Sequence, residues 1–116
     1  MKPSVLIVDD EKVICEGIAR LLADKYITYQ AYNGREAVDI LRKNKNIDVM
    51  LCDIIMPEMD GLAVLKEIGN KFNAIMISAV GQDSMIKEAK DSGAKGYIVK
   101  PFEKDNVVAE VKKVLG

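Results

Sequence analysis

Acidic, hydroxyl and lysine side chains stand in this sequence where short apolar runs end. They are Asp9 and Asp10 after residues 5–8, Asp53 after residues 49–52, Ser78 after residues 74–77, and Lys100 after residues 97–99. Carboxylates brought together repel one another, and the pKa of at least one of them rises unless a cation lies among them. Mg²⁺ prefers such hard oxygen ligands together with phosphate, and a lysine ammonium suits a phosphoryl oxygen. The pattern therefore indicates phosphoryl transfer onto a carboxylate.

Each of these residues also has an ordinary structural explanation. Asp9 and Asp10 could cap the helix that follows them. An aspartate at the end of a strand, such as Asp53, is often a turn residue. Taken singly, Ser78 and Lys100 are explained equally well as a turn residue and a solvated amine. The functional interpretation therefore depends on whether the fold brings all of them to one place.

Apolar runs alternate with amphipathic segments along the chain. The runs lie at residues 5–8, 27–32, 49–52, 74–78 and 97–99, and most have the residue types of strands buried on both faces. Between them, apolar residues recur at helical spacing, as at Ile14, Ile18 and Leu21. Asn33, with Glu36 three residues later, forms a variant of the capping box at the start of another helix. This alternation predicts five strand–helix units, (βα)5, in a parallel sheet covered on both faces.

The number of strands restricts the architecture. Five strands are too few for a closed eight-stranded barrel, so we expect an α/β fold with an open, doubly wound, flavodoxin-like sheet of strand order 2-1-3-4-5. Parallel strands end at one edge of the sheet, and strands one and three are neighbours in this order. Asp9, Asp10 and Asp53 should therefore meet at the switch point of the sheet, where open α/β sheets bind ligands.

Composition and charge exclude several classes of function. The 116 residues are 49% hydrophobic and 30% charged with a net charge of −1, which fits a single domain over residues 1–116. This charge gives no general attraction to nucleic acid, and the apolar runs are too short to span a membrane. We expect no secretory signal and a cytoplasmic location.

Histidine is absent, which excludes catalysis by an internal Ser-His or Cys-His pair. The same absence excludes this chain as the histidine phosphodonor of a relay. The two cysteines, Cys15 and Cys52, do not have the spacing of metal ligands, and we expect them to be small buried thiols.

Together, these motifs resemble those of the receiver domain of two-component response regulators, over essentially the whole chain. The resemblance is carried by residues 6–10 (LIVDD), residues 53–61 (DIIMPEMDG), Ser78-Ala79, Gly93-Ala94 and residues 100–102 (KPF). The sequence is most similar to the single-domain receivers of phosphorelays and chemotaxis, because nothing follows the fifth helix. We therefore expect a stand-alone receiver without an output domain.

The resemblance implies a role for each residue of the acidic edge. Asp53 is expected to accept a phosphoryl group from a histidine kinase or a histidine phosphotransferase. Asp9, Asp10, Asp53 and the main-chain carbonyl of Ile55 are expected to bind Mg²⁺. Lys100 would contact the phosphoryl group, and the peptide bond after it, before Pro101, is expected to be cis.

The resemblance also implies a switch. Ser78 would move toward the phosphoryl oxygen, and the small side chain of Ala79 would leave its backbone amide accessible. Tyr97 matches the aromatic residue that swings inward when the hydroxyl moves, and that motion would reshape the surface around the fourth helix and fifth strand.

Partners are expected to be proteins: a kinase or phosphotransferase and a downstream target, bound by a monomer. The first helix carries more apolar residues than one core stripe needs, so we expect Ile14 and Ile18, together with Pro57, to dock a kinase's helical bundle. The alternative for Ile14 is that it belongs wholly to the core. Ile55 and Val80 are expected to screen the acyl phosphate from water and slow its hydrolysis, unless they merely pack.

Three other classes of protein remain as alternatives. An aspartyl-phosphate phosphatase of the haloacid dehalogenase kind needs a second acid two residues after the nucleophile, where this sequence has Ile55. A flavodoxin-like cofactor binder needs a phosphate-cradling loop after the first strand, where Asp9, Asp10 and Glu11 would repel phosphate. An adaptor that works without phosphorylation has no need to keep the complete set of acidic, hydroxyl and lysine residues.

Overall fold

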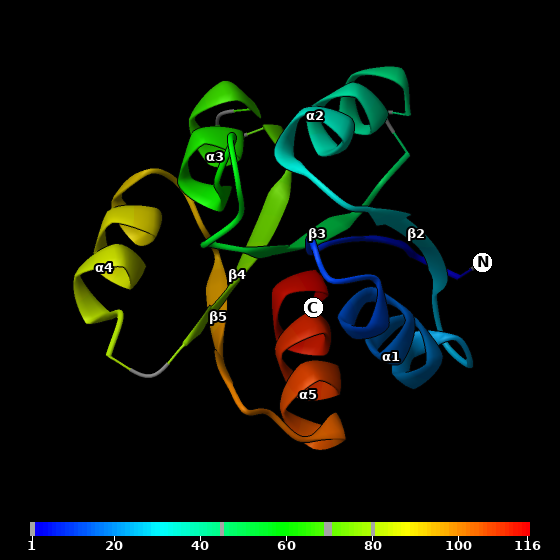
Figure 1. Ribbon diagram of the computed structural model, residues 1–116. Coiled ribbons are helices and arrows are strands. Elements are labelled where there is room, and N and C mark those ends of the chain that lie inside the picture. Colours follow the sequence, from blue (N-terminus) through cyan, green and yellow to red (C-terminus); the bar gives the residue numbers. More distant parts are fainter. Residues whose placement is uncertain (1, 45, 69–70, 80) are drawn as a thin grey trace.

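The computed structural model describes residues 2–44, 46–68, 71–79 and 81–116. Strands and helices alternate along these residues (Figure 1). The elements are β1 (Ser4–Val8), α1 (Lys12–Leu22), β2 (Ile27–Ala31), α2 (Gly34–Lys43), β3 (Val49–Asp53), α3 (Gly61–Ile68), β4 (Asn73–Ala79), α4 (Asp83–Asp91), β5 (Gly96–Lys100) and α5 (Lys104–Leu115). None of these helices is long and apolar enough to cross a membrane.

All strands pair in parallel, in the order β2-β1-β3-β4-β5. The predicted fold class and strand order are therefore confirmed. β1 and β3 are neighbours, with Val8 opposite Cys52, so the residues that follow these two strands leave the sheet side by side. This adjacency brings together residues that are more than forty positions apart in the sequence.

Helices cover both faces of the sheet, with α1 and α5 on one side and α2, α3 and α4 on the other (Figure 1). Alternate strand residues face the two layers, because successive side chains of a strand point to opposite faces. Leu6, Met50 and Met76 belong to the cluster under α2–α4, whereas Ile7 and Leu51 belong to the cluster under α1 and α5. These apolar strands are buried on both faces, as the sequence predicted.

The capping interactions differ in detail from those predicted. Asn33 accepts a hydrogen bond from the backbone N–H of Glu36 at 2.8 Å, which confirms it as the N-cap of α2. The Glu36 carboxylate accepts a hydrogen bond from the N–H of Tyr32 at 3.1 Å, whereas in a regular capping box it would accept from the N–H of the N-cap residue Asn33. Glu11 is the N-cap residue of α1, so Asp9 and Asp10 do not occupy that position.

Gly61 allows the loop after β3 to fold back onto the end of that strand. Its N–H donates to the Ile54 carbonyl at 2.8 Å. A Cβ at this position would lie closer than 3.0 Å to the Asp53 carbonyl oxygen, the Ile54 Cα and the Met76 side chain. Only a residue without a side chain fits at this first position of α3, which packs directly against the end of the strand that carries Asp53.

Gly61→Ala should lower the free energy of unfolding by about 2 kcal/mol, because the added methyl group overpacks a site bounded by backbone atoms. Urea unfolding followed by circular dichroism measures this change. Gly17→Ala is the matched control. A Cβ at Gly17 in α1 meets nothing within 4 Å, so this change should stabilise the protein by about 0.5–1 kcal/mol. Equal effects of the two substitutions would contradict the packing argument.

Candidate functional site

Acidic side chains gather at the edge where β1 and β3 end. Carboxylate oxygens of Asp9, Asp10 and Asp53 all lie within 4.8 Å of one another. Asp9 and Asp53 are buried, whereas Asp10 is exposed. The predicted meeting of the three carboxylates is therefore present, and it leaves one side of the cluster open to solvent.

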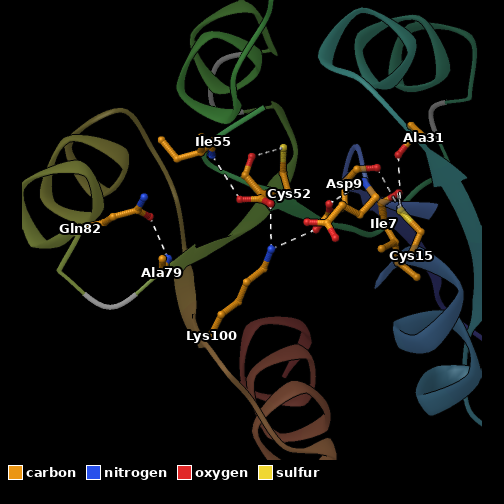
Figure 2. A network of polar contacts seen from close by, with 11 residues as sticks. Ile7, Asp9, Cys15, Ala31, Cys52, Ile55, Ala79, Gln82 and Lys100 are labelled. Carbon is orange, nitrogen blue, oxygen red and sulfur yellow. Dashed lines mark hydrogen bonds and ion pairs between the residues drawn. The ribbon is translucent and has the colours of Figure 1, made fainter. Parts of the chain in front are cut away.

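Lys100 reaches this cluster from the end of β5 (Figure 2). Its Nζ lies 3.0 Å from Oδ2 of Asp53 and 3.4 Å from Oδ2 of Asp9. Burial lowers the pKa of Lys100, but the hydrogen bond and charge of Asp53, with those of Asp9, raise it more, so the pKa lies above its usual value. The lysine is thus a permanent cation that bridges β1 and β3. The peptide bond between Lys100 and Pro101 is cis, as predicted.

Backbone N–H groups fix the orientation of the two buried carboxylates. The N–H of Glu11 donates to Oδ1 of Asp9 at 2.9 Å, and that of Ile55 donates to Oδ1 of Asp53 at 3.2 Å. Burial nevertheless raises the pKa of Asp9, and the charge of Asp53 adds to this, against the opposing effects of Glu11 and Lys100. A single lysine therefore does not compensate the cluster fully.

The donor set fits a divalent cation that prefers hard ligands. Carboxylate oxygens from Asp9, Asp10 and Asp53 are the kind of ligand that Mg²⁺ takes, and the open side leaves room for water and for a phosphoryl oxygen. Burial, and to a smaller extent the charge of Asp53, raise the pKa of Asp9, so a bound cation would favour its charged form. The role of the Ile55 carbonyl as a further ligand stays a prediction.

Ser78 lies at the end of β4 and is fully buried. Among the described residues, its Oγ is the buried side-chain oxygen without a hydrogen-bond partner. Leaving a buried hydroxyl unpaired costs about 1–3 kcal/mol, so a hydroxyl in this state is poised to bond an incoming acceptor. The backbone amide of the next residue, Ala79, was expected to be accessible. In this structure that amide donates to Oε1 of Gln82 at 2.8 Å, and its access to a phosphoryl oxygen stays a prediction.

Tyr97 lies on β5, and its ring faces Lys90 of α4. Its side chain is 41% exposed, and the Nζ of Lys90 in α4 lies 4.7 Å from the centre of its ring. The ring therefore contacts the surface of α4, on the side of the sheet where the switch was expected to act. Whether it moves inward stays a prediction.

Both cysteines are buried free thiols, as expected. Cys15 packs beneath the site, with its Sγ 3.4 Å from the Asp9 carbonyl oxygen (Figure 2). Burial and the charge of Asp9 raise the pKa of Cys15 to about 11, and burial also raises that of Cys52. The two thiols are therefore neutral packing groups at ordinary pH, and they take no part in the chemistry.

The predicted docking residues divide into exposed and buried ones. Ile18 is only 1% exposed and packs in the core under α1, so it lies at the floor of the surface and offers a partner almost no area, which contradicts its expected docking role. Ile14 is half-buried and Pro57 is exposed. Val13, which was not singled out, is 79% exposed. Its position, outside the buried stripe of the helix, was the signal that could have identified it.

A shallow apolar groove lies beside Val13. It has a volume of about 260 Å³, and its lining consists of Val13, Ile14, Gly17, Ile18, Leu21 and Phe102. Ile55 is 50% exposed, so it does not merely pack in the core, and its screening role stays a prediction. Val80, the other residue expected to screen the site, lies outside the described residues.

Comparisons with known proteins agree with this geometry. Residues 5–112 match the family described as response regulator receiver domain. The chain is 39% identical to the chemotaxis protein CheY of Bacillus subtilis (strain 168), with 99% of each chain covered. It is 38% identical to the sporulation initiation phosphotransferase F of the same organism, over 99% of this chain and 95% of that one. The structure of the chemotaxis protein CheY4 of Vibrio cholerae superposes with a TM-score of 0.91 at 29% identity, covering 99% of this chain and 100% of the other.

Replacing Asp9 by Asn should stabilise the metal-free protein at pH 7 by about 1–2 kcal/mol, because a buried charge that Lys100 compensates only in part is removed. Folding raises the pKa of Asp9 above 3.8, so the native state binds the proton of this carboxyl more tightly than the unfolded state. The free energy of unfolding of the wild type should therefore fall as the pH rises from about 3.8 through the raised native pKa. The variant should lack this loss.

Urea unfolding in EDTA at several pH values measures the difference between the two proteins. Millimolar Mg²⁺ should stabilise the wild type and have little effect on Asp9→Asn, since a ligand that binds only the native state stabilises it. A variant that is less stable than the wild type across this pH range would show that Asp9 is adequately compensated.

Proposed function

The chain belongs to the response regulator receiver family of two-component systems, and from this premise we propose that Asp53 is the aspartate that accepts the phosphoryl group. Receivers of this family accept a phosphoryl group on an aspartate and signal to a protein partner. Asp53 is the proposed acceptor because the other groups of the site converge on it. The choice is supported by the contacts of the Asp53 carboxylate. It accepts a hydrogen bond from the Ile55 N–H, pairs with Lys100 and lies beside the carboxylates of Asp9 and Asp10.

The chemistry requires no general base. An ionised carboxylate is already the nucleophile, so the absence of histidine is no obstacle. An Asp53 oxygen forms a bond to phosphorus while the bond from phosphorus to the donor's imidazole nitrogen breaks, and the electron pair of that bond returns to the nitrogen. The product is an acyl phosphate on Asp53 and a free histidine on the donor.

The charges of the site favour the transferring group. Lys100, 3.0 Å from Asp53, is placed to contact a phosphoryl oxygen, which carries negative charge throughout the transfer. Asp9, Asp10 and Asp53 would hold Mg²⁺, which when bound supplies the positive charge that the three carboxylates and the phosphoryl group require. In this proposal the domain accelerates its own modification, and it turns over no free substrate.

The conformational response to phosphorylation is proposed to involve residues that lie around the acidic cluster. The unpaired hydroxyl of Ser78 is proposed to bond a phosphoryl oxygen, which would satisfy a buried polar group. Tyr97 packs against Lys90 in this structure. When Ser78 moves to bond the phosphoryl oxygen, Tyr97 would move inward and alter the surface of α4 and β5. Ile55, half-exposed beside Asp53, is proposed to limit the access of water to the acyl phosphate and so slow its hydrolysis.

The proposed partners are proteins. Relatives named as a chemotaxis protein and a sporulation phosphotransferase support a histidine kinase or a histidine phosphotransferase as donor and a further protein as target. The apolar groove lined by Val13 and Ile14 lies on α1, and Pro57 is exposed in the loop after β3. We propose that these surfaces dock the donor's helical bundle. A cytoplasmic location is proposed as well, supported by the two free thiols.

Incubation with acetyl phosphate and Mg²⁺ should add one phosphoryl group to the wild type. Asp53→Ala should gain none, because the acceptor oxygen is removed, and omission of Mg²⁺ should reduce the gain strongly. Intact-mass spectrometry measures both effects. Asp39→Ala, which removes an acidic residue of α2 away from the site, is the control and should be labelled like the wild type. Labelling of Asp53→Ala at the wild-type rate would refute the assignment.

Val13→Ala and Ile14→Ala should each slow phosphotransfer from a histidine kinase roughly tenfold, the effect of truncating a well-packed interface residue. Their labelling by acetyl phosphate should be unchanged, since neither residue belongs to the acidic cluster or pairs with Lys100. Ile27→Ala, which truncates an exposed aliphatic residue on β2, is the control and should leave both reactions unaffected. If both donors slowed in parallel, the surface would be supporting the fold and not docking a partner.

A further inference from the structure

The backbone amide at the end of β4 is bonded by a side chain. The N–H of Ala79 donates to Oε1 of Gln82 at 2.8 Å (Figure 2). Gln82 is the N-cap residue of α4, but its side chain makes no capping bond to that helix. The side chain at the N-cap position is thus engaged with the preceding strand and not with the first turn of α4.

The direction of this amide follows from the sheet. Peptide groups along a strand point alternately to its two neighbours. The carbonyl of Ile77 points toward β3, because it accepts from the N–H of Ile54 at 2.9 Å. The N–H of Ala79, two residues later, points to the same side. It therefore faces the loop that begins at Asp53, where the N–H of Ile55 already donates to the carboxylate.

Two backbone donors thus flank the position that a phosphoryl group on Asp53 would occupy. The donor on Ile55 is engaged by Asp53 itself, and the donor on Ala79 is engaged by the glutamine. A phosphoryl oxygen is a stronger acceptor than a neutral amide, since bonds to ionised groups are about twice as strong. Phosphorylation is therefore able to displace Gln82 from this amide.

Gln82 also begins the fourth helix. Its backbone carbonyl accepts from the N–H groups of Met85 and Ile86, which form the first turn of α4. Gly81, with a φ of +91°, has the left-handed conformation that glycine adopts without strain. From its place after Gly81, the Gln82 side chain reaches back to the amide of Ala79, three residues earlier in the chain. One residue thus joins the amide beside the phosphorylation site to the N-terminus of a helix.

We propose that the Gln82 side-chain carbonyl is a built-in competitor that occupies the Ala79 amide until a phosphoryl oxygen replaces it. This inference rests on the proposed function, in which Asp53 carries the phosphoryl group. Gln82 is a positioning residue of the unphosphorylated state. Its displacement releases the side chain of the residue that starts α4.

Two substitutions should change the affinity for a phosphoryl analogue in opposite directions. Gln82→Ala removes the competitor, so beryllium fluoride with Mg²⁺ should bind about threefold more tightly, as expected for loss of one exposed hydrogen bond in the free state. Gln82→Glu places a charged acceptor on the amide and a negative charge near the analogue. It should therefore bind about threefold more weakly. Ser84→Ala, a polar truncation on the exposed first turn of α4, is the control and should match the wild type.

Titration followed by ¹H–¹⁵N spectra measures the affinity and reports the Ala79 amide directly. The Ala79 resonance should move in metal-free Gln82→Ala, and in the wild type it should move on addition of the analogue. Wild-type affinity in both Gln82 variants would overturn the inference, even if Gln82→Ala lowered stability toward urea, because that combination means a purely structural bond. A wild type that neither binds the analogue nor takes up phosphoryl from acetyl phosphate would overturn the proposed function, and the inference with it.

Discussion

The mutual repulsion of carboxylates at one edge of the sheet is the constraint on which the rest of this structure depends. Asp9 and Asp53 are buried, and their oxygens lie within 4.8 Å of each other and of Asp10. Lys100 offsets part of this charge through contacts of 3.0 and 3.4 Å, and the pKa of Asp9 stays raised. Such a cluster costs stability in the free protein. The same carboxylates are the kind of ligand that Mg²⁺ prefers, and a bound cation would relieve their repulsion.

The fold around this edge provides rigid support. β1, β3 and β5 each end at the site, and apolar layers on both faces of the sheet hold these strands in register. The elements that respond lie at the margins of the site. The hydroxyl of Ser78 lacks a partner, the amide of Ala79 has a replaceable one, and Tyr97 rests on the surface of α4. A fixed centre with replaceable contacts around it is suited to report a covalent change to a distant surface.

Much of this could be predicted from the sequence, because the strands are continuous apolar runs and the polar residues follow them at once. Parallel topology then requires Asp9, Asp53 and Lys100 to meet, and the cis bond after Lys100 was implied by the family resemblance. The environment of individual side chains was harder to predict. Ile18 has the same chemistry as Ile14, and only the rotation of α1 against the sheet decides that Ile18 is buried. Gln82 was missed for a related reason, because nothing in the residue type shows that a helix-capping side chain turns back toward the preceding strand.

The position of Lys100 near the end of the chain determines when the site can assemble during synthesis. The acidic residues of the site come from β1 and β3, in the first half of the chain, whereas Lys100 follows at the end of β5. A chain that has left the ribosome only as far as β4 contains the three carboxylates of the site but not Lys100, which pairs with two of them. Because domains generally fold as units, the site is complete only when β5 has joined the sheet. A chain that ends before β5 therefore holds the carboxylates of the site without Lys100, the cation that contacts Asp9 and Asp53 in the complete fold.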